Sequence, residues 1–283
     1  MSAATIRRLT PDDVEEILRM DVFSGLSGAR LAAETAAGDD YLWLGMAGSS
    51  GRLFAAHRGM RWGRHLLLKG VFVEEAERGS GAAPQLAFAL RSEARAHGFA
   101  GIAAWVEPHM AEAALAGILR LRQTGPYLHR YEIPLHGPRD AAGGRPANAG
   151  TIAMGPAGEA SFAPGVEDLF AWGETYANGE QVTHWVMDGP RFVLSACPSP
   201  ATTELPRLTA HVSPLARAQG AQTLEVPVQA TDLVAALSLT NTGARRLSRT
   251  PVRLGRFDFA PRPANATNAP NATNAVDAGR RSR

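Results

Sequence analysis

The sequence predicts an α/β protein in which a mixed central sheet is flanked by helices and the arrangement is duplicated in tandem. Apolar, β-rich runs alternate with helical patterns from residue 5 to residue 135, which is typical of a sheet with covering helices. A second set of similar runs follows at a constant distance along the chain. With 283 residues, the chain has enough material for two domains of ordinary size.

The first segment begins with a strand over residues 5–9 and a helix over residues 11–20. Thr10 can cap this helix, and Pro11 supplies a helical φ at its first position. The further expected elements are a helix over 30–37, strands over 41–47, 53–60 and 65–74, a helix over 84–97, a strand over 102–106, a helix over 111–121 and a strand pair around 127–135.

The repeat links residues that are 122 positions apart. Pro84-Gln85-Leu86 corresponds to Pro206-Arg207-Leu208, and the helix that begins there is followed in both copies by a β-like run and a second helix. Two alanine-rich helices can resemble each other by composition alone, but a gap-free register across three elements favours duplication. A repeat of this length indicates duplicated domains, because solenoid repeats are shorter.

The domain organisation follows from this repeat and from changes in composition. We expect a first domain over residues 1–136, a linker rich in Gly, Pro and Ala over 137–150, a degenerate second domain over 151–260, and a disordered tail over 261–283. The second copy has two prolines and no glycine where the first has a glycine-rich turn, so we expect only the first copy to present free backbone N–H groups there.

That turn, Arg78-Gly79-Ser80-Gly81-Ala82-Ala83, is the most informative motif of the chain. It lies between a β-rich run and a helical pattern, where backbone N–H groups at a helix N-terminus can bind a diphosphate. Neither GxxxxGK[ST] nor GxGxxG is present here. The motif R-x-x-G-x-(G/A) fits, with Arg78, Gly81 and Ala83 in its specified places. It resembles the acyl-CoA loop of the GNAT acyltransferases, and the predicted order of elements is similar to that fold.

The resemblance implies a site for acetyl-CoA or another acyl-CoA. The main chain of Val71, Phe72 and Val73 would pair with the pantetheine arm, and backbone N–H donors on this strand would polarise the thioester carbonyl. The diphosphate would be bound by the N–H groups of Arg78, Gly79, Ser80, Gly81, Ala82 and Ala83, with a further contact from the Ser80 hydroxyl.

The same resemblance leaves the catalytic acid unassigned. Many members of the family carry an Asn just after the strand that follows the loop's helix, and a Tyr about seven residues later as general acid. Counted without gaps, those places hold Met110 and Gly117, and neither can replace them. The proton for the leaving thiolate could come from a tyrosine of the other half or from water.

A general base near neutral pH would help to remove the proton from the attacking amine. Glu74 and Glu75 end the strand beside the loop, and Glu107 and His109 end the next strand. Each could instead be an ordinary solvated surface residue. His57 and His65 are interpreted as core or sheet-face residues.

Composition limits the partners. The net charge of +2 gives no reason to expect nucleic-acid binding, since basic charge without a fold signature is poor support for it. One cysteine, Cys197, excludes an internal disulfide and a cysteine-based metal cluster, and no metal is expected. No secretory signal and no apolar stretch of about 18 residues is found, so we expect a cytoplasmic protein that does not insert into membranes.

The expected function is therefore direct transfer of an acyl group, with acetyl as the first choice, from acyl-CoA to a small amine, by a monomer or homodimer. Two alternatives stay open. One is a CoA-binding module or sensor that has lost catalysis, and the other is a scaffold with a relic loop. The loop reports the cofactor and not the reaction, so it does not separate them.

Overall fold

The computed structural model describes residues 4–23, 25–38, 40–136, 147–154, 160–164, 175–177, 180–195 and 201–260. Cys197, the expected tail over 261–283 and most of the expected linker lie outside the described residues. We call residues 4–136 the first segment and residues 147–260 the second segment.

The first segment contains six strands, among which the helices are interspersed. Its strands are β1 (Thr5–Arg8), β2 (Tyr41–Ala47), β3 (Leu53–Trp62), β4 (His65–Val73), β5 (Gly101–Val106) and β6 (Arg122–Pro134). Its α-helices are α1 (Val14–Leu18), α2 (Gly28–Ala36), α3 (Ala82–Ala96) and α4 (Ala111–Ile118), and 3-10 turns cover Pro11–Asp13, Asp21–Phe23 and Glu75–Glu77.

The second segment supplies the other elements. Its strands are β7 (Ala149–Met154), β8 (Ala160–Pro164), β9 (Thr175–Ala177), β10 (Glu180–Asp188), β11 (Arg191–Leu194), β12 (Thr223–Gln229), β13 (Arg245–Arg246) and β14 (Val252–Asp258), and its helices are α5 (Ala201–Ala218) and α6 (Leu233–Asn241).

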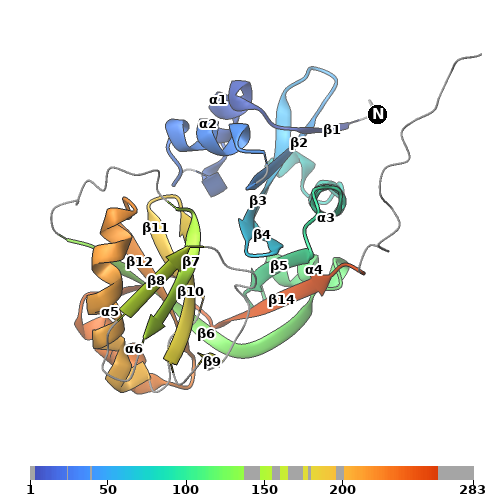
Figure 1. Cartoon of the computed structure of the whole chain (residues 1–283). Helices are drawn as coiled ribbons and strands as arrows, with labels where there is room; N and C mark the ends of the chain where they lie inside the picture. Colours follow the sequence, from blue (N-terminus) through green and yellow to red (C-terminus); the bar gives the residue numbers. More distant parts are fainter. Residues whose placement is uncertain are drawn as a thin grey trace, which may run out of the picture.

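One continuous sheet passes through both segments (Figure 1). Its strand order is β1-β2-β3-β4-β5-β14-β6-β12-β11-β10-β7-β8, with β13 beside β6 and β9 beside β10. The pairs β4·β5 and β11·β12 are parallel, and each is connected through a helix, α3 or α5. The protein is therefore an α/β protein with a mixed sheet flanked by helices, as the sequence predicts.

The repeat is confirmed element by element. Helix α3 ends at Ala96 and α5 at Ala218, 122 positions later. Strands β5 and β12 begin at Gly101 and Thr223, and α4 and α6 begin at Ala111 and Leu233, again at that distance. Each copy thus contributes a parallel strand pair, its crossover helix and a following helix.

The two segments exchange their last strands, which the sequence did not reveal. Strand β14 lies between β5 and the first part of β6, where Val252–Arg256 face Leu128–Arg122. The second part of β6, Leu128–Pro134, lies in turn between β12 and β13. The predicted strand pair around residues 127–135 was wrong, because β6 is one long strand whose neighbours come from the second segment. The domain boundaries given above stay a prediction.

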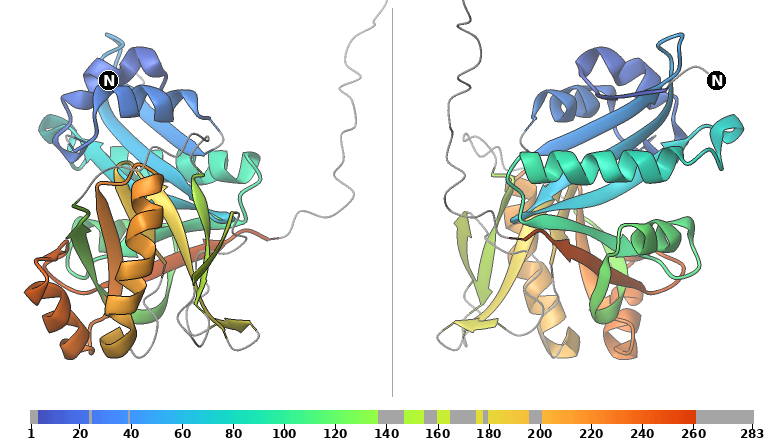
Figure 2. Two further views of the ribbon diagram at one scale, coloured as in Figure 1. Left: turned by 60° about the vertical axis from the view of Figure 1, so that its left-hand side comes forward. Right: turned by 90° about the vertical axis from the view of Figure 1, so that its right-hand side faces the viewer.

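Helices cover the two faces of the first segment's sheet (Figure 2). One core lies between this sheet and the helices α1 and α2. It includes Ile17, Leu31, Trp43 and Met60 and extends to Val186 of the second segment. The other face packs against α3 and α4 through a second core, to which Leu86, Leu90 and Ile102 belong. A third core lies between the second segment's strands and α5 and α6.

Substitution of Gly101 can test the exchange of strands between the two segments. A Cβ at this position would overlap the carbonyl oxygen of Phe257 in β14 and lie 2.9 Å from His65, so the pairing of β5 with β14 leaves no room for a side chain. We expect Gly101→Ala to lower the free energy of unfolding by about 1–3 kcal/mol, the usual cost of overpacking, in urea denaturation.

Gly117 in α4 is the matched control, because a Cβ there meets nothing within 4 Å. Gly117→Ala should raise the stability by about 0.5–1 kcal/mol. Equal stabilities of the two variants would contradict the placement of β14 beside β5.

Candidate functional site

Strands β4 and β5 run together and then separate. Their parallel pairing covers only His65–Leu68 and Gly101–Ala104. After that point β5 continues along β14, while β4 stays with β3. No described strand pairs with the other edge of β4 from Gly70 to Val73.

A β-bulge marks the point of separation. Arg58 pairs with Gly70 and Gly59 pairs with Leu68, so Lys69 is an extra residue without a partner in β3. Such a bulge bends its strand and redirects the side chain of the extra residue. Here it lies at the position where β4 leaves β5.

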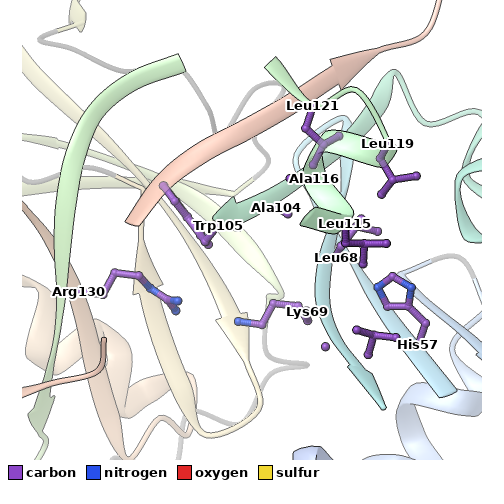
Figure 3. A pocket seen from close by; sticks show the side chains of 12 residues that line it. His57, Leu68, Lys69, Ala104, Trp105, Leu115, Ala116, Leu119, Leu121 and Arg130 are labelled. Carbon is purple, nitrogen blue, oxygen red and sulfur yellow. The ribbon is translucent and has the colours of Figure 1, made fainter. Parts of the chain in front are cut away.

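A cavity of about 170 Å³ opens between the separating strands (Figure 3). Residues of β4, β5 and α4 form most of its wall, and Arg130 of β6 reaches it from the side of the second segment. The lining residues are His57, Leu68, Lys69, Gly70, Val71, Ala104, Trp105, Leu115, Ala116, Leu119, Leu121 and Arg130. The cavity is thus largely apolar with a few polar groups, as is usual for small-molecule sites.

The glycine-rich loop follows β4 directly and is exposed from Glu75 to Ser80. The N–H groups of Arg78 and Ser80 donate to the carbonyls of Glu75 and Glu77, at 3.2 Å each, and are therefore occupied. The Arg78 guanidinium donates to the carbonyl of Val73 and ties the loop to β4.

Other N–H groups of the loop remain available at the start of α3. Within the described part of the chain, no backbone or side-chain acceptor is found for the N–H groups of Gly79, Gly81, Ala82 and Ala83. Gly81 has a φ of 87°, a left-handed conformation that suits glycine. Free N–H donors therefore lie side by side at the N-terminus of α3, a helix of 15 residues. Such an N-terminus favours binding of an anion.

The residues predicted as general bases lie apart from the cavity. Glu75 is in the exposed 3-10 turn, and His109 is exposed. Glu107 accepts hydrogen bonds from the backbone N–H and the hydroxyl of Thr250, at 3.0 and 2.7 Å, and so holds the chain that leads into β14. None of the three is among the described lining residues, and their catalytic role stays a prediction.

Sequence analysis missed a buried cluster of charges beside the cavity. Asp188, the last residue of β10, accepts from Lys69 at 2.8 Å and from Arg58 at 3.0 Å. Arg58 also donates to Glu34 of α2 at 2.8 and 2.7 Å, and Arg30 pairs with Glu34 at 2.8 Å. The cluster thus joins a carboxylate of the second segment to cations of the first.

Electrostatics in this cluster depend on the ion pairs. Burial alone would raise the pKa of Asp188, but Lys69 and Arg58 hold that pKa well below its usual range. Burial lowers the pKa of Lys69, and Asp188 opposes this only in part. Burial also lowers the pKa of His57 to about 4, so its imidazole is neutral at pH 7. His57 and His65 are both buried, as expected.

One signal for this cluster was present in the sequence. Lys69 is the only lysine among 29 basic residues, and it lies in the run that leads to the glycine-rich loop. No such signal in the sequence pointed to Asp188 and Arg130, because these residues reach the neighbourhood of the cavity through contacts between the two segments. Among the described residues, no group of three or more His, Cys, Asp or Glu could bind a metal ion, and none of the described helices has the length and apolarity needed to span a membrane.

Comparison with known proteins finds similarity to solved structures only. No family model matches the chain, and no curated protein matches it. A GCN5-related N-acetyltransferase from Sphaerobacter thermophilus matches with 13% identity over 91% of this chain and 96% of that chain, at a TM-score of 0.49. A tandem GNAT protein from the clavulanic acid biosynthesis pathway matches with 12% identity over 92% and 100%, at 0.47.

Shorter acetyltransferases match about half of this chain. One is a GNAT superfamily phosphinothricin acetyltransferase from Sinorhizobium meliloti in complex with AcCoA, with 19% identity over 51% of this chain and 83% of that chain, at a TM-score of 0.39.

Asp188 should be the most sensitive residue of the charge cluster. Asp188→Asn removes the carboxylate and leaves the cations of Arg58 and Lys69 buried without it, so we expect a loss of about 3–5 kcal/mol in the free energy of unfolding. Asp40→Asn is the matched control: Asp40 pairs with Arg61 at 2.9 Å, and both side chains are 41% exposed. This variant should lose at most about 1 kcal/mol. Both free energies of unfolding would be measured by urea denaturation. Similar losses in the two variants would contradict a larger contribution of the buried ion pairs than of the exposed one.

Proposed function

We propose that the chain is an acyl-CoA-dependent N-acyltransferase of the GNAT type, which transfers an acyl group, acetyl as the first choice, directly to a small amine. The observation that carries this proposal is the separation of β4 from β5 immediately before a loop with free N–H donors. An unpaired strand edge, an apolar cavity and an anion site then follow one another along a few residues, which suits a ligand with an amide-bearing arm and a diphosphate.

The diphosphate of the CoA would be bound by the backbone N–H groups of Gly79, Gly81, Ala82 and Ala83. Arg78 and Ser80 are left out of this set of donors, because their N–H groups already donate hydrogen bonds within the turn. The field of helix α3 supports an anion at this place.

The pantetheine arm would pair with the free edge of β4 at Val71, Phe72 and Val73, in the manner of an added strand. Its acyl end would then reach the cavity, where backbone N–H groups of β4 can polarise the thioester carbonyl. The attacking amine would lose its proton to a base, for which Glu75, Glu107 and His109 stay our candidates, through water where they do not line the cavity.

A second candidate function is a CoA-binding module without catalysis. It is favoured by the position of the candidate bases outside the cavity wall and by Met110 and Gly117 at the places where related enzymes carry Asn and Tyr. Binding geometry supports both functions equally, so only turnover separates them.

Calorimetric titration with acetyl-CoA, followed by measurement of CoA release with a panel of amines, tests the proposal. Binding with amine-dependent release supports the enzyme. Binding without release for any amine leaves the binding module, and absence of binding would contradict both and favour a scaffold.

Gly81→Asp should weaken acetyl-CoA binding by at least about tenfold. The new carboxylate opposes the diphosphate, and loss of one charge-assisted hydrogen bond costs about 1.5–3 kcal/mol, where 1.4 kcal/mol is tenfold in affinity. Gly51→Asp is the matched control, because Gly51 has a similar φ of 79° in the turn between β2 and β3 and a Cβ there meets nothing within 4 Å. Unchanged affinity in Gly81→Asp by calorimetry would remove the loop from the site.

A further inference from the structure

Lys69 is the one lysine of the chain and lines the cavity between the separating strands. Its side chain is only 15% exposed, and Figure 3 shows its amine pointing toward Arg130. The β-bulge places it there, because the extra residue of β4 is the first one after the paired stretch with β5. A primary amine therefore lies where the proposed function would bring a thioester.

The amine lies within a buried cluster of charges. The buried members are two cations, Arg58 and Lys69, and two carboxylates, Glu34 and Asp188, while the Arg30 side chain at the edge of the cluster is 29% exposed. Arginine does not release its proton in proteins, whereas a buried lysine does so readily. Lys69 is therefore the buried cation of this cluster that can release a proton.

Further charges lie on the far side of the cavity. Arg130 pairs with buried Glu225 at 2.5 Å, and Arg191 lies 3.5 Å from the other oxygen of this carboxylate, so Glu225 is shared by two cations. Burial is the largest influence on Lys69 and lowers its pKa. Lysine in this position is thus a better nucleophile than an exposed lysine at the same pH.

The distance along β4 suits a CoA that occupies the loop. Val73, at the start of the loop, lies four positions after Lys69, which is about 13 Å at ~3.3 Å per residue. The pantetheine arm, with two amide units and their flanking methylenes, is of similar length when extended. Its thiol end would then lie near the bulge.

We propose that Lys69 accepts an acyl group from acyl-CoA bound in this cavity, so that the protein modifies itself at its only lysine; the inference rests on the proposed function. The Nζ lone pair attacks the thioester carbonyl, a C–N bond forms and the C–S bond breaks. Lys69 gives up its ammonium proton to solvent before the attack, and the second proton that the nitrogen loses afterwards passes to the CoA thiolate, which leaves as the free thiol. The products are an Nε-acyl-lysine and CoA, with no change of oxidation state.

The fold can accommodate this modification. Acylation removes the charge of Lys69, but Asp188 keeps its ion pair with Arg58 at 3.0 Å. The acyl group would occupy the cavity, whose wall near Lys69 includes Leu68 and Trp105.

Incubation of the full chain with acetyl-CoA, without any amine, tests the inference by intact mass and by fragmentation of the labelled peptide. We expect one acetyl group on Lys69 in the wild-type protein and none at this position in Lys69→Arg. Gly81→Asp should be modified at least about tenfold more slowly, in line with its weaker binding, while Gly51→Asp should behave as the wild-type protein does.

Any other outcome contradicts the inference. The outcomes also differ in whether the proposed function survives. Acetyl-CoA binding without a label on Lys69, or a label only on the α-amine of Met1, rejects self-modification and leaves the proposed enzyme intact. Equal labelling of wild-type protein and Gly81→Asp shows chemical acylation from solution and also rejects it. Absence of acetyl-CoA binding in calorimetry removes the proposed function itself.

Discussion

The ion pairs of Asp188 connect the cavity to the rest of the molecule. This carboxylate comes from the end of β10 in the second segment, and its partners Lys69 and Arg58 come from the sheet of the first. Buried charges are costly unless they are paired, so these contacts favour an arrangement of the two segments in which all three groups are paired. The wall of the candidate site is therefore set by contacts between segments as much as by β4 and β5 themselves.

The site also depends on the fact that β4 stays paired with β3 after its pairing with β5 has ended. Parallel pairing with β5 ends at Leu68, and the bulge at Lys69 bends β4 while β3 continues beside it. Because β5 follows β14 instead, the space between β4 and β5 widens toward the loop. The bulge in β4 thus accompanies both the unpaired strand edge and the apolar cavity, and the loop that contains Gly81 follows β4 in the chain.

Sequence patterns predicted the parts of this arrangement that depend on neighbours in the chain. Periodicity identified β2 to β5 and α3, and the glycine spacing located the loop, because both are local properties. The charge cluster was missed, since Asp188 meets Arg58 across 130 positions. The single long strand β6 was expected as a strand pair around residues 127–135, and its pairing with β12 and β14 could not be predicted because it depends on contacts with the second segment.

The reciprocal exchange of strands has a consequence for biosynthesis. The ribosome releases β5 more than a hundred residues before β14, the strand that occupies its outer edge. During that interval β5 carries unsatisfied backbone groups on one side, which a nascent chain can pair wrongly with another molecule. His65 of β4 and Asp258 of β14 are 2.7 Å apart, so this contact can form only after β14 has been synthesised.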